Sequence, residues 1–167
     1  MYESCPDLTI HELDENHICC LGRVPEKLRM TEAQVEELWT MHPPEYPKIL
    51  IHGQWVPTPR WQQAYGADYH FAGQTSEALR VPPLLAPIRD WAQEVFDPRL
   101  NGLLLNWYDA SLGHYIGAHR DSTKSMCPGA PIVMISYCAS RMMRLRRWKG
   151  KETFDFPVSD GTVCVLP

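Results

Sequence analysis

The spacing of hydrophobic residues predicts a first helix near the start of the chain. Residues 31–34, Thr-Glu-Ala-Gln, form a capping-box pattern, and apolar residues continue from it at helical spacing through Trp39. Pro43 and Pro44 follow at once and cannot extend a helix. The acidic residues 1–30 show no such period, and we expect an irregular N-terminal extension there.

A second helix is predicted between two pairs of helix-limiting residues. Pro82 and Pro83 are expected to open it, and Asp97-Pro98 to close it. Its expected buried face carries Leu84, Ile88, Trp91 and Val95.

Short apolar and aromatic segments, cut by glycine, proline and other turn residues, predict strands in the rest of the chain. These segments are residues 49–73, 103–108, 132–139, 143–148 and 162–166. Two helices followed by a run of strands favour an α+β fold in which the helices brace one face of a β-sandwich or jelly roll.

Composition and charge narrow the class of protein. A length of 167 residues with 44% hydrophobic and 22% charged residues predicts one soluble domain over 1–167. The net charge of −4 argues against nucleic-acid binding through overall charge, although a local basic surface stays compatible with it. The six cysteines show no C-x-x-C spacing and are typical of reduced thiols in an intracellular protein, so no zinc site is predicted. No apolar run reaches the ~18 residues of a membrane span, and we expect a cytoplasmic location, or a nuclear one in a eukaryotic source.

The residues His119-Arg120-Asp121 are the first candidate for a metal-binding site. Along an extended chain, residues i and i+2 point to the same side, so this imidazole and carboxylate can converge on one metal ion. With a distant histidine they would complete the facial triad of non-haem Fe(II) oxygenases. A surface turn is the alternative, because chance alone often produces a His-x-Asp pair.

The neighbouring sequence strengthens the metal-site interpretation. Asn106 and Tyr108 form another i, i+2 pair, and an amide beside a phenol can hydrogen-bond a small dicarboxylate. The joint pattern is more specific than any one piece of it. It comprises Asn106-x-Tyr108, Ile116-Gly117-x-His119-Arg120-Asp121, Pro128-Gly129-Ala130-Pro131-Ile132 and Ser136-Tyr137-Cys138-Ala139-Ser140-Arg141.

With these motifs the sequence resembles the AlkB family, iron- and 2-oxoglutarate-dependent dioxygenases that remove alkyl groups from nucleobases. The resemblance runs from about Leu38 to the last residue. It includes a signature of the nucleic-acid-repair branch, Pro59-Arg60-x-Gln62-x-x-Tyr65-Gly66-x-x-Tyr69-x-Phe71-x-Gly73.

The resemblance implies a role for each matched residue. It makes His119 and Asp121 catalytic iron ligands, and Asn106 and Tyr108 contacts of the 2-oxoglutarate cosubstrate. The substrate-binding residues it implies are Tyr69, Phe71, Arg60 and Arg141. It further implies a double-stranded β-helix (jelly roll), Fe(II), 2-oxoglutarate and O2 as cofactors, and oxidative demethylation of alkylated DNA or RNA by a protein that is a monomer when complete, with no membrane partner.

The aromatic pair also makes chemical sense by itself. A base must leave its stack before its alkyl group can be reached, and aromatic faces such as Tyr69 and Phe71 offset the lost stacking. The alternative is that these residues are ordinary aromatic strand residues.

Two later parts of the family pattern are missing, although residues 160–167 still resemble the strand that leads up to them. The family places a second iron-binding histidine several strands after His-x-Asp, and cosubstrate-binding arginines beyond it, whereas His119 is the last histidine here. We therefore expect a chain truncated before the second histidine, with the C-terminal jelly-roll strands missing and turnover impaired. His114 would point to the opposite side of a continuous strand from His119 and is expected to be structural or to support the site.

The sequence leaves open both the role of one basic segment and the function of the whole chain. Residues 141–149 carry five positive charges and no acid, which suits either phosphate binding or a solvated strand face. Three functions stay open for the chain: an active demethylase, a non-catalytic protein that binds nucleic acid, or a 2-oxoglutarate oxygenase that acts on another substrate.

Overall fold

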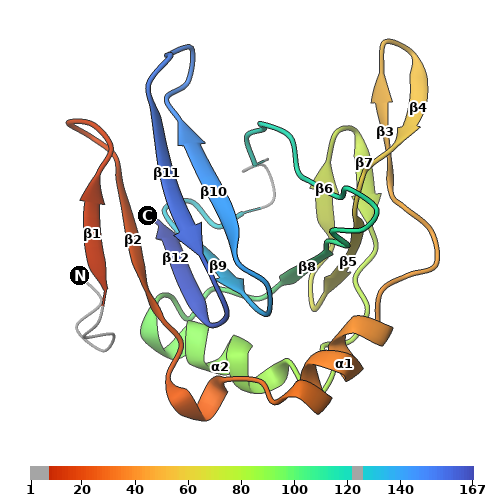
Figure 1. Ribbon diagram of the computed structural model, residues 1–167, viewed down its shortest axis with the longest axis horizontal. Coiled ribbons are helices and arrows are strands. Elements are labelled where there is room, and N and C mark those ends of the chain that lie inside the picture. The colour runs from red at the N-terminus through yellow and green to blue at the C-terminus, as the bar shows by residue number, and fades with distance from the viewer. Residues whose placement is uncertain (1–7, 122–125) are drawn as a thin grey trace.

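The computed structural model describes residues 8–121 and 126–167, and it shows an α+β fold, as predicted (Figure 1). The helices of this part are α1 (Glu32–Thr40), α2 (Ala86–Val95) and the short 3-10 helix η1 (Glu26–Leu28). The strands are β1 (Thr9–Glu12), β2 (Ile18–Arg23), β3 (Lys48–Ile51), β4 (Gln54–Pro57), β5 (Trp61–Tyr65), β6 (Tyr69–Phe71), β7 (Gln74–Ser76), β8 (Leu103–Trp107), β9 (Ile132–Ser136), β10 (Arg141–Arg146), β11 (Thr153–Val158) and β12 (Thr162–Leu166).

The expectation of an irregular segment over 1–30 is wrong for the described residues 8–30. They form β1, β2 and η1, and β2 pairs with β12 in an antiparallel sheet of order β1-β2-β12-β9. Cys19 and Cys20 of β2 are buried by these long-range contacts. The local sequence shows no strand signal here, because an acidic turn interrupts the segment. The strand that pairs with β2 lies near the other end of the chain.

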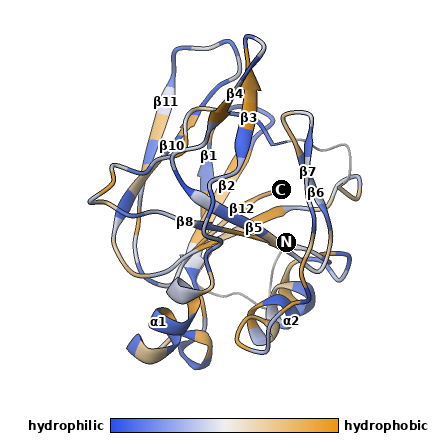
Figure 2. Ribbon diagram, turned by 90° about the vertical axis from the view of Figure 1, so that its right-hand side faces the viewer, coloured by the Kyte–Doolittle hydropathy of each residue, from blue (hydrophilic) through white to orange (hydrophobic). Residues whose placement is uncertain are grey.

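In this four-stranded sheet the inner strand β12 is buried on both faces, and its residues alternate between two packing partners. Val163 and Val165 are fully buried and pack with Trp91 and Ala92 of α2. Cys164 points to the other face and packs with Phe156 of the β10–β11 hairpin. In Figure 2 hydrophobic residues concentrate along the central strands, while α2 alternates between hydrophobic and hydrophilic positions, as a helix with one buried face should.

The second structural unit near the site is the antiparallel pair β5–β8. Trp107 at the end of β8 is 5% exposed, and its indole N–H donates to the carbonyl of Leu38 in α1 at 2.8 Å. On the neighbouring strand Trp61 stacks with His42, with ring centroids 4.0 Å apart. The capping box of α1 at Thr31 forms as predicted, and α1 therefore braces β5–β8 while α2 braces the larger sheet (Figure 1).

Two tight hairpins, β3–β4 and β6–β7, share one turn chemistry. The residue pairs at their tips have positive φ, with His52 and Gly53 at 48° and 80° and Ala72 and Gly73 at 46° and 78°. Two successive positive φ values define the type I′ turn, whose twist matches that of the flanking strands. The β3–β4 hairpin and β6 overlap the predicted strand region of residues 49–73, whereas β7, like β11, lies outside the predicted strand segments.

The second helix begins later than predicted. It starts at Ala86, because Pro87 has no N–H and fits only the first turn of a helix, and Pro82 begins a preceding turn instead. Similarly, β10 begins at Arg141, two residues before the predicted start.

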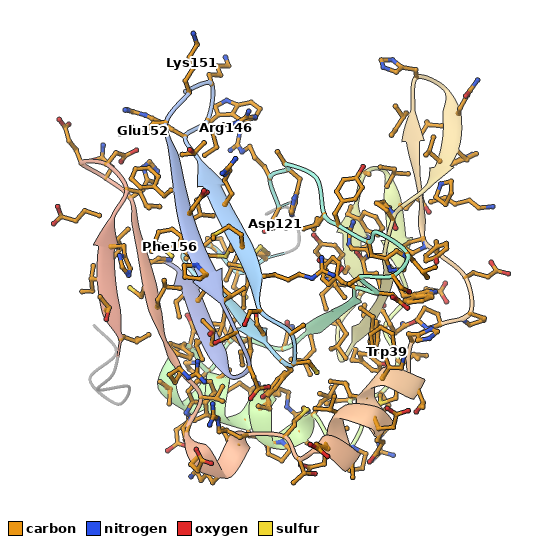
Figure 3. The ribbon with its side chains drawn as sticks, viewed as in Figure 1. Trp39, Asp121, Arg146, Lys151, Glu152 and Phe156 are labelled. Atoms are coloured by element: carbon orange, nitrogen blue, oxygen red, sulfur yellow. The ribbon has the colours of Figure 1, made fainter. Side chains whose placement is uncertain are left out.

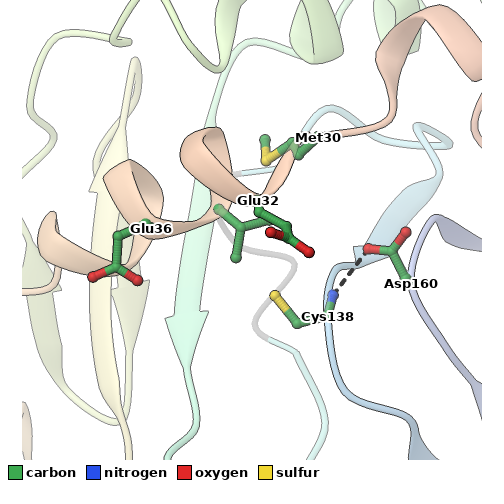
Figure 4. A pocket seen from close by; sticks show the side chains of 6 residues that line it. Met30, Glu32, Glu36, Cys138 and Asp160 are labelled. Atoms are coloured by element: carbon green, nitrogen blue, oxygen red, sulfur yellow. Dashed lines mark hydrogen bonds between the residues drawn. The ribbon is translucent and has the colours of Figure 1, made fainter.

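No helix in the described part of the chain is long and apolar enough to cross a membrane. A hollow of about 450 Å³ lies beside α1 (Figure 4). Its lining residues are Met30, Glu32, Val35, Glu36, Cys138 and Asp160. None of them is a predicted site residue.

Candidate active site

Half of the candidate site stands on β5 and β8. In the antiparallel register Gln62 lies directly opposite Asn106, so the two side chains share one face of the pair. Arg60, two residues before Gln62, extends along the same face and joins both of them. Its Nε donates to Asn106 Oδ1 at 2.8 Å, and its guanidinium Nη2 donates to Gln62 Oε1 at 3.1 Å.

The other half stands on the segment that leaves β8, and it contains the predicted metal ligands. Nε2 of His119 lies 3.5 Å from Oδ1 of Asp121, so the two side chains do face the same way. The carbonyl of Gly117 accepts a hydrogen bond from Nδ1 of His119 at 2.8 Å. This bond places the proton of the neutral imidazole on Nδ1 and leaves the Nε2 lone pair for a metal ion.

The charges of this pair are matched. The hydrogen bond with Asp121 raises the pKa of His119, and the same bond lowers the pKa of the Asp121 carboxyl group. Side-chain exposures of 48% and 35% leave both groups open to a ligand. An imidazole nitrogen beside an ionised carboxylate suits a divalent transition metal.

Tyr69 of β6 lies directly beside the predicted metal ligands His119 and Asp121, which are called the metal pair below. The hydroxyl of Tyr69 donates to Oδ1 of Asp121 at 3.4 Å, and burial raises the pKa of Tyr69. Its ring is stacked with that of Phe71, with centroids 5.5 Å apart and planes at 21°. Figure 3 shows Asp121 in the region between the β6–β7 hairpin and β10.

Tyr108 and Arg141 meet next to this group. The Arg141 guanidinium lies 5.3 Å from the centre of the Tyr108 ring, and it donates to the carbonyl of His114 at 3.0 Å. Burial raises the pKa of Tyr108, while the positive charges of Arg60 and Arg141 act in the opposite direction. Arg60 also acts electrostatically on Tyr69 and His119, so it lies near both halves of the candidate site.

The structure thus brings together all eight residues predicted from the sequence, Phe71 through its contact with Tyr69. The residues present fit both parts of the predicted cofactor set, a metal ion at His119 and Asp121 and an anionic ligand among the donors near Arg60. Among residues 8–121 and 126–167, no cluster of three His, Cys, Asp or Glu side chains forms around a common point.

His114 is a packed residue, as predicted. It is 5% exposed, its Nδ1 accepts from the backbone N–H of Asp109 at 3.1 Å, and its Nε2 is 3.1 Å from the Tyr46 hydroxyl. Both ring nitrogens are therefore already used in the fold.

Gln62 was not predicted as a site residue, although it lies within the signature of the nucleic-acid-repair branch, residues 59–73. Gln62 is 5% exposed, and its Nε2 has no hydrogen-bond partner in the described part of the chain. A buried amide left without a partner costs about 1–3 kcal/mol. The i, i+2 spacing from Arg60 was a usable signal, but only the pairing of β5 with β8 shows that Gln62 faces Asn106.

Two arginines of the basic segment, residues 141–149, already lie close to acidic side chains and are therefore less available to bind phosphate. Arg144 forms a two-point ion pair with Asp155 across the β10–β11 hairpin, at 2.5 and 2.6 Å, and Arg147 lies 3.8 Å from Asp14. Trp148 is 66% exposed, and the guanidinium of Arg120 lies over its indole ring, 4.6 Å from the ring centre. The hairpin tip therefore contacts the segment that carries the metal pair.

Comparison with known proteins gives one consistent answer. The chain is 36% identical over 110 residues to the DNA oxidative demethylase ALKBH2 of Mus musculus, a stretch that covers 63% of this chain and 46% of the relative. The Homo sapiens protein of that name is 35% identical and the Bos taurus protein 33% identical over the same length, with 42% and 39% of each relative covered. No protein-family model matches the chain.

The matched stretch spans less than half the length of each of these relatives. In the structure, the motifs that predicted the site also have their side chains gathered at one place. The resemblance of this chain to the AlkB-like dioxygenases is confirmed.

Proposed function

We propose that this chain carries the active-site residues of a dioxygenase for oxidative demethylation of alkylated nucleobases in DNA. The observation that carries the proposal is the meeting of three groups: Nε2 of His119, the carboxylate of Asp121, and the stacked pair that begins with Tyr69. The relatives are DNA demethylases by name, which favours DNA over RNA.

His119 and Asp121 would hold Fe(II), with the Gly117 carbonyl fixing the imidazole orientation. Bound iron, with 2-oxoglutarate and O2, would supply the oxidising power to hydroxylate a methyl carbon, and cleavage of the bond between that carbon and the base nitrogen would then release formaldehyde. The Tyr69 hydroxyl, which donates to Asp121, holds that carboxylate in place. Asn106 and Tyr108 would contact the cosubstrate.

Tyr69 and Phe71 would receive the damaged base. The Tyr69 hydroxyl reaches Asp121, and the Phe71 ring is stacked with that of Tyr69, so the aromatic pair stands next to the predicted metal ligands. A base that is taken out of the duplex loses its stacking, and an aromatic platform restores about 1–3 kcal/mol of it. Arg60 and Arg141 add positive charge near these residues, which suits a polyanionic substrate.

We further propose the double-stranded β-helix as the complete architecture. The four-stranded sheet and the β10–β11 hairpin already pack face to face through Cys164 and Phe156, and β5–β8 carries the other part of the site. The sequence similarity supports this architecture.

The direct test is formaldehyde release from a methylated oligonucleotide in the presence of Fe(II) and 2-oxoglutarate. We expect slow release, because only two protein ligands are present, and this release should depend on both additions and be abolished by Asp121→Asn, which keeps the shape of the side chain but weakens its metal binding. His17→Ala, at an exposed histidine outside the site, is the matched control and should leave release unchanged. A chain that binds Fe(II) and methylated DNA but releases no formaldehyde would contradict the proposal.

Nucleic-acid binding without turnover is a second candidate function, favoured by the exposed residues of the β10–β11 hairpin. Arg146, Trp148 and Lys149 are exposed there, and Figure 3 shows Arg146 and Lys151 near the hairpin end. Exposed cations beside an aromatic ring suit a phosphate backbone and an unstacked base.

Salt dependence of oligonucleotide binding tests this candidate. Arg146→Ala should lower the slope of log K against log salt by about 1, as expected when one phosphate contact is lost. Arg144→Ala is the matched control, because Arg144 is already neutralised by Asp155 and should change the slope less. Equal slopes for Arg146→Ala and the unaltered chain would argue against this surface.

A further inference from the structure

Gln62 is a buried polar residue at the site to which the proposed chemistry assigns no role. It lies in β5, is 5% exposed, and stands opposite Asn106 on β8. A polar side chain in such a position ordinarily has all of its hydrogen-bonding groups satisfied.

Only one end of the Gln62 amide is satisfied. Its Oε1 accepts from Arg60 at 3.1 Å, and Arg60 is itself held by its bond to Asn106. The amide is thereby fixed with its oxygen toward the guanidinium. Its Nε2 is buried and meets no acceptor among the residues that the structure describes.

The groups around this free donor share one chemistry. Arg60 occupies Oδ1 of Asn106, so that the amino group is the part of Asn106 left to donate. The hydroxyl of Tyr108 lies within the electrostatic influence of both Arg60 and Arg141. Two amide donors, a phenol and two guanidinium groups together suit a ligand oxyanion.

We propose that Gln62 is a further cosubstrate-binding residue, whose Nε2 donates a hydrogen bond to a carboxylate oxygen of the 2-oxoglutarate held beside Asn106 and Tyr108. This inference rests on the proposed function. A phosphate group of the nucleic acid offers the same oxyanion chemistry, and the experiment separates the two sources.

The decisive variant is Gln62→Glu. It keeps an oxygen for Arg60 to donate to, but it replaces the free donor by a second acceptor. We expect a folded protein with a melting temperature equal to or above that of the unaltered chain, because an unsatisfied amide is removed and Arg60 gains a charged partner. We also expect 2-oxoglutarate to bind about 10- to 100-fold more weakly, measured calorimetrically with Mn(II) in place of iron.

Gln63→Glu is the matched control. The neighbouring Gln63 points to the other side of β5, and its Nε2 already donates to the carbonyls of Ala64 and Glu77, at 2.9 and 3.0 Å. The same chemical change there should lower the melting temperature and leave 2-oxoglutarate affinity unchanged. Gln62→Met, which removes the donor without adding charge, serves as the second variant and should also weaken 2-oxoglutarate binding.

The outcomes separate this inference from the proposed function. If the unaltered chain with Mn(II) binds no 2-oxoglutarate, both are overturned. If it binds 2-oxoglutarate and both Gln62 variants bind equally well, only the role of Gln62 is overturned, as it would be if Nε2 merely held a water molecule. A loss confined to binding of inorganic phosphate or an unmodified oligonucleotide would also overturn the cosubstrate assignment, whereas a loss confined to 2-oxoglutarate supports it.

Discussion

The two halves of the candidate site are built differently. Gln62 and Asn106 stand on paired strands, and Arg60, which directly precedes β5, donates a hydrogen bond to each of them. His119 and Asp121 stand outside any strand or helix, with side chains 48% and 35% exposed. Strand pairing fixes the first group before any ligand arrives, whereas the second depends on one backbone carbonyl and on contacts between side chains.

This difference predicts how substitutions should behave. Changes that disturb β5–β8 should alter stability and ligand binding together. Changes in the metal-ligand segment should alter ligand binding and leave stability nearly constant. The largest effect is expected where the sheet-borne half is anchored to α1.

Trp107→Ala should lower the free energy of unfolding by about 3–5 kcal/mol, because it leaves a large cavity beneath the site. It also removes the hydrogen bond to the Leu38 carbonyl. Trp107→Phe should cost less, since most of the ring volume remains. Urea denaturation measures both, and a loss below about 1 kcal/mol for the alanine variant would contradict the anchoring role.

His119→Ala should separate binding from stability. We expect divalent metal affinity to fall at least about 100-fold, because one of two protein ligands is lost. The free energy of unfolding should change by no more than about 0.5 kcal/mol, because the side chain is half exposed. Metal titration and urea denaturation of the same sample test this, and a large loss of stability would show that the segment belongs to the folded core.

Phe71→Leu should weaken binding of a methylated oligonucleotide by about 1–3 kcal/mol, through lost stacking. Metal affinity should stay the same, since Phe71 reaches the metal pair only through Tyr69. Tyr69→Phe is the matched variant that keeps the ring and loses the hydroxyl bond to Asp121. If stacking is the main contribution, fluorescence anisotropy should show a smaller loss for Tyr69→Phe than for Phe71→Leu.

Ala72→Gly should raise the free energy of unfolding by about 0.5–1 kcal/mol, because alanine is strained at a positive φ. Gly73→Ala, at the adjacent position of the same turn, should have the opposite effect. No atom lies within 4 Å of a Cβ added at Gly73, so backbone strain alone would cause the loss. Thermal denaturation of both variants measures how strongly the β6–β7 hairpin is coupled to the remaining fold.

Low pH should weaken the ion pair between Asp97 and Arg99. Arg99 also donates to the Pro128 carbonyl at 3.1 Å, near the start of β9. The hydrogen bonds from Arg99 lower the pKa of Asp97 to about 2. A carboxyl group whose pKa is lower in the folded than in the unfolded chain stabilises above its unfolded value of about 4, and this contribution is lost as pH falls from 4 through 2. Asp97→Asn should therefore flatten the loss of stability between pH 4 and pH 2, measured by urea unfolding, whereas an unchanged slope would contradict this role.

The sequence by itself determined the parts of this protein that depend on neighbouring residues. The capping box at Thr31 predicted where α1 begins, and the spacing of His119 and Asp121 predicted that they face the same way. These signals are local, because helix capping and strand alternation act over two to four residues. Family motifs added the identity of the other site residues.

Only the tertiary structure decided the features that need a distant partner. β2 is a buried strand because β12 pairs with it, Arg144 is neutralised because Asp155 lies opposite, and Gln62 faces Asn106 because β5 pairs with β8. Burial, charge pairing and strand register depend on which segments meet in space. The free amide of Gln62 is therefore visible only in the folded chain.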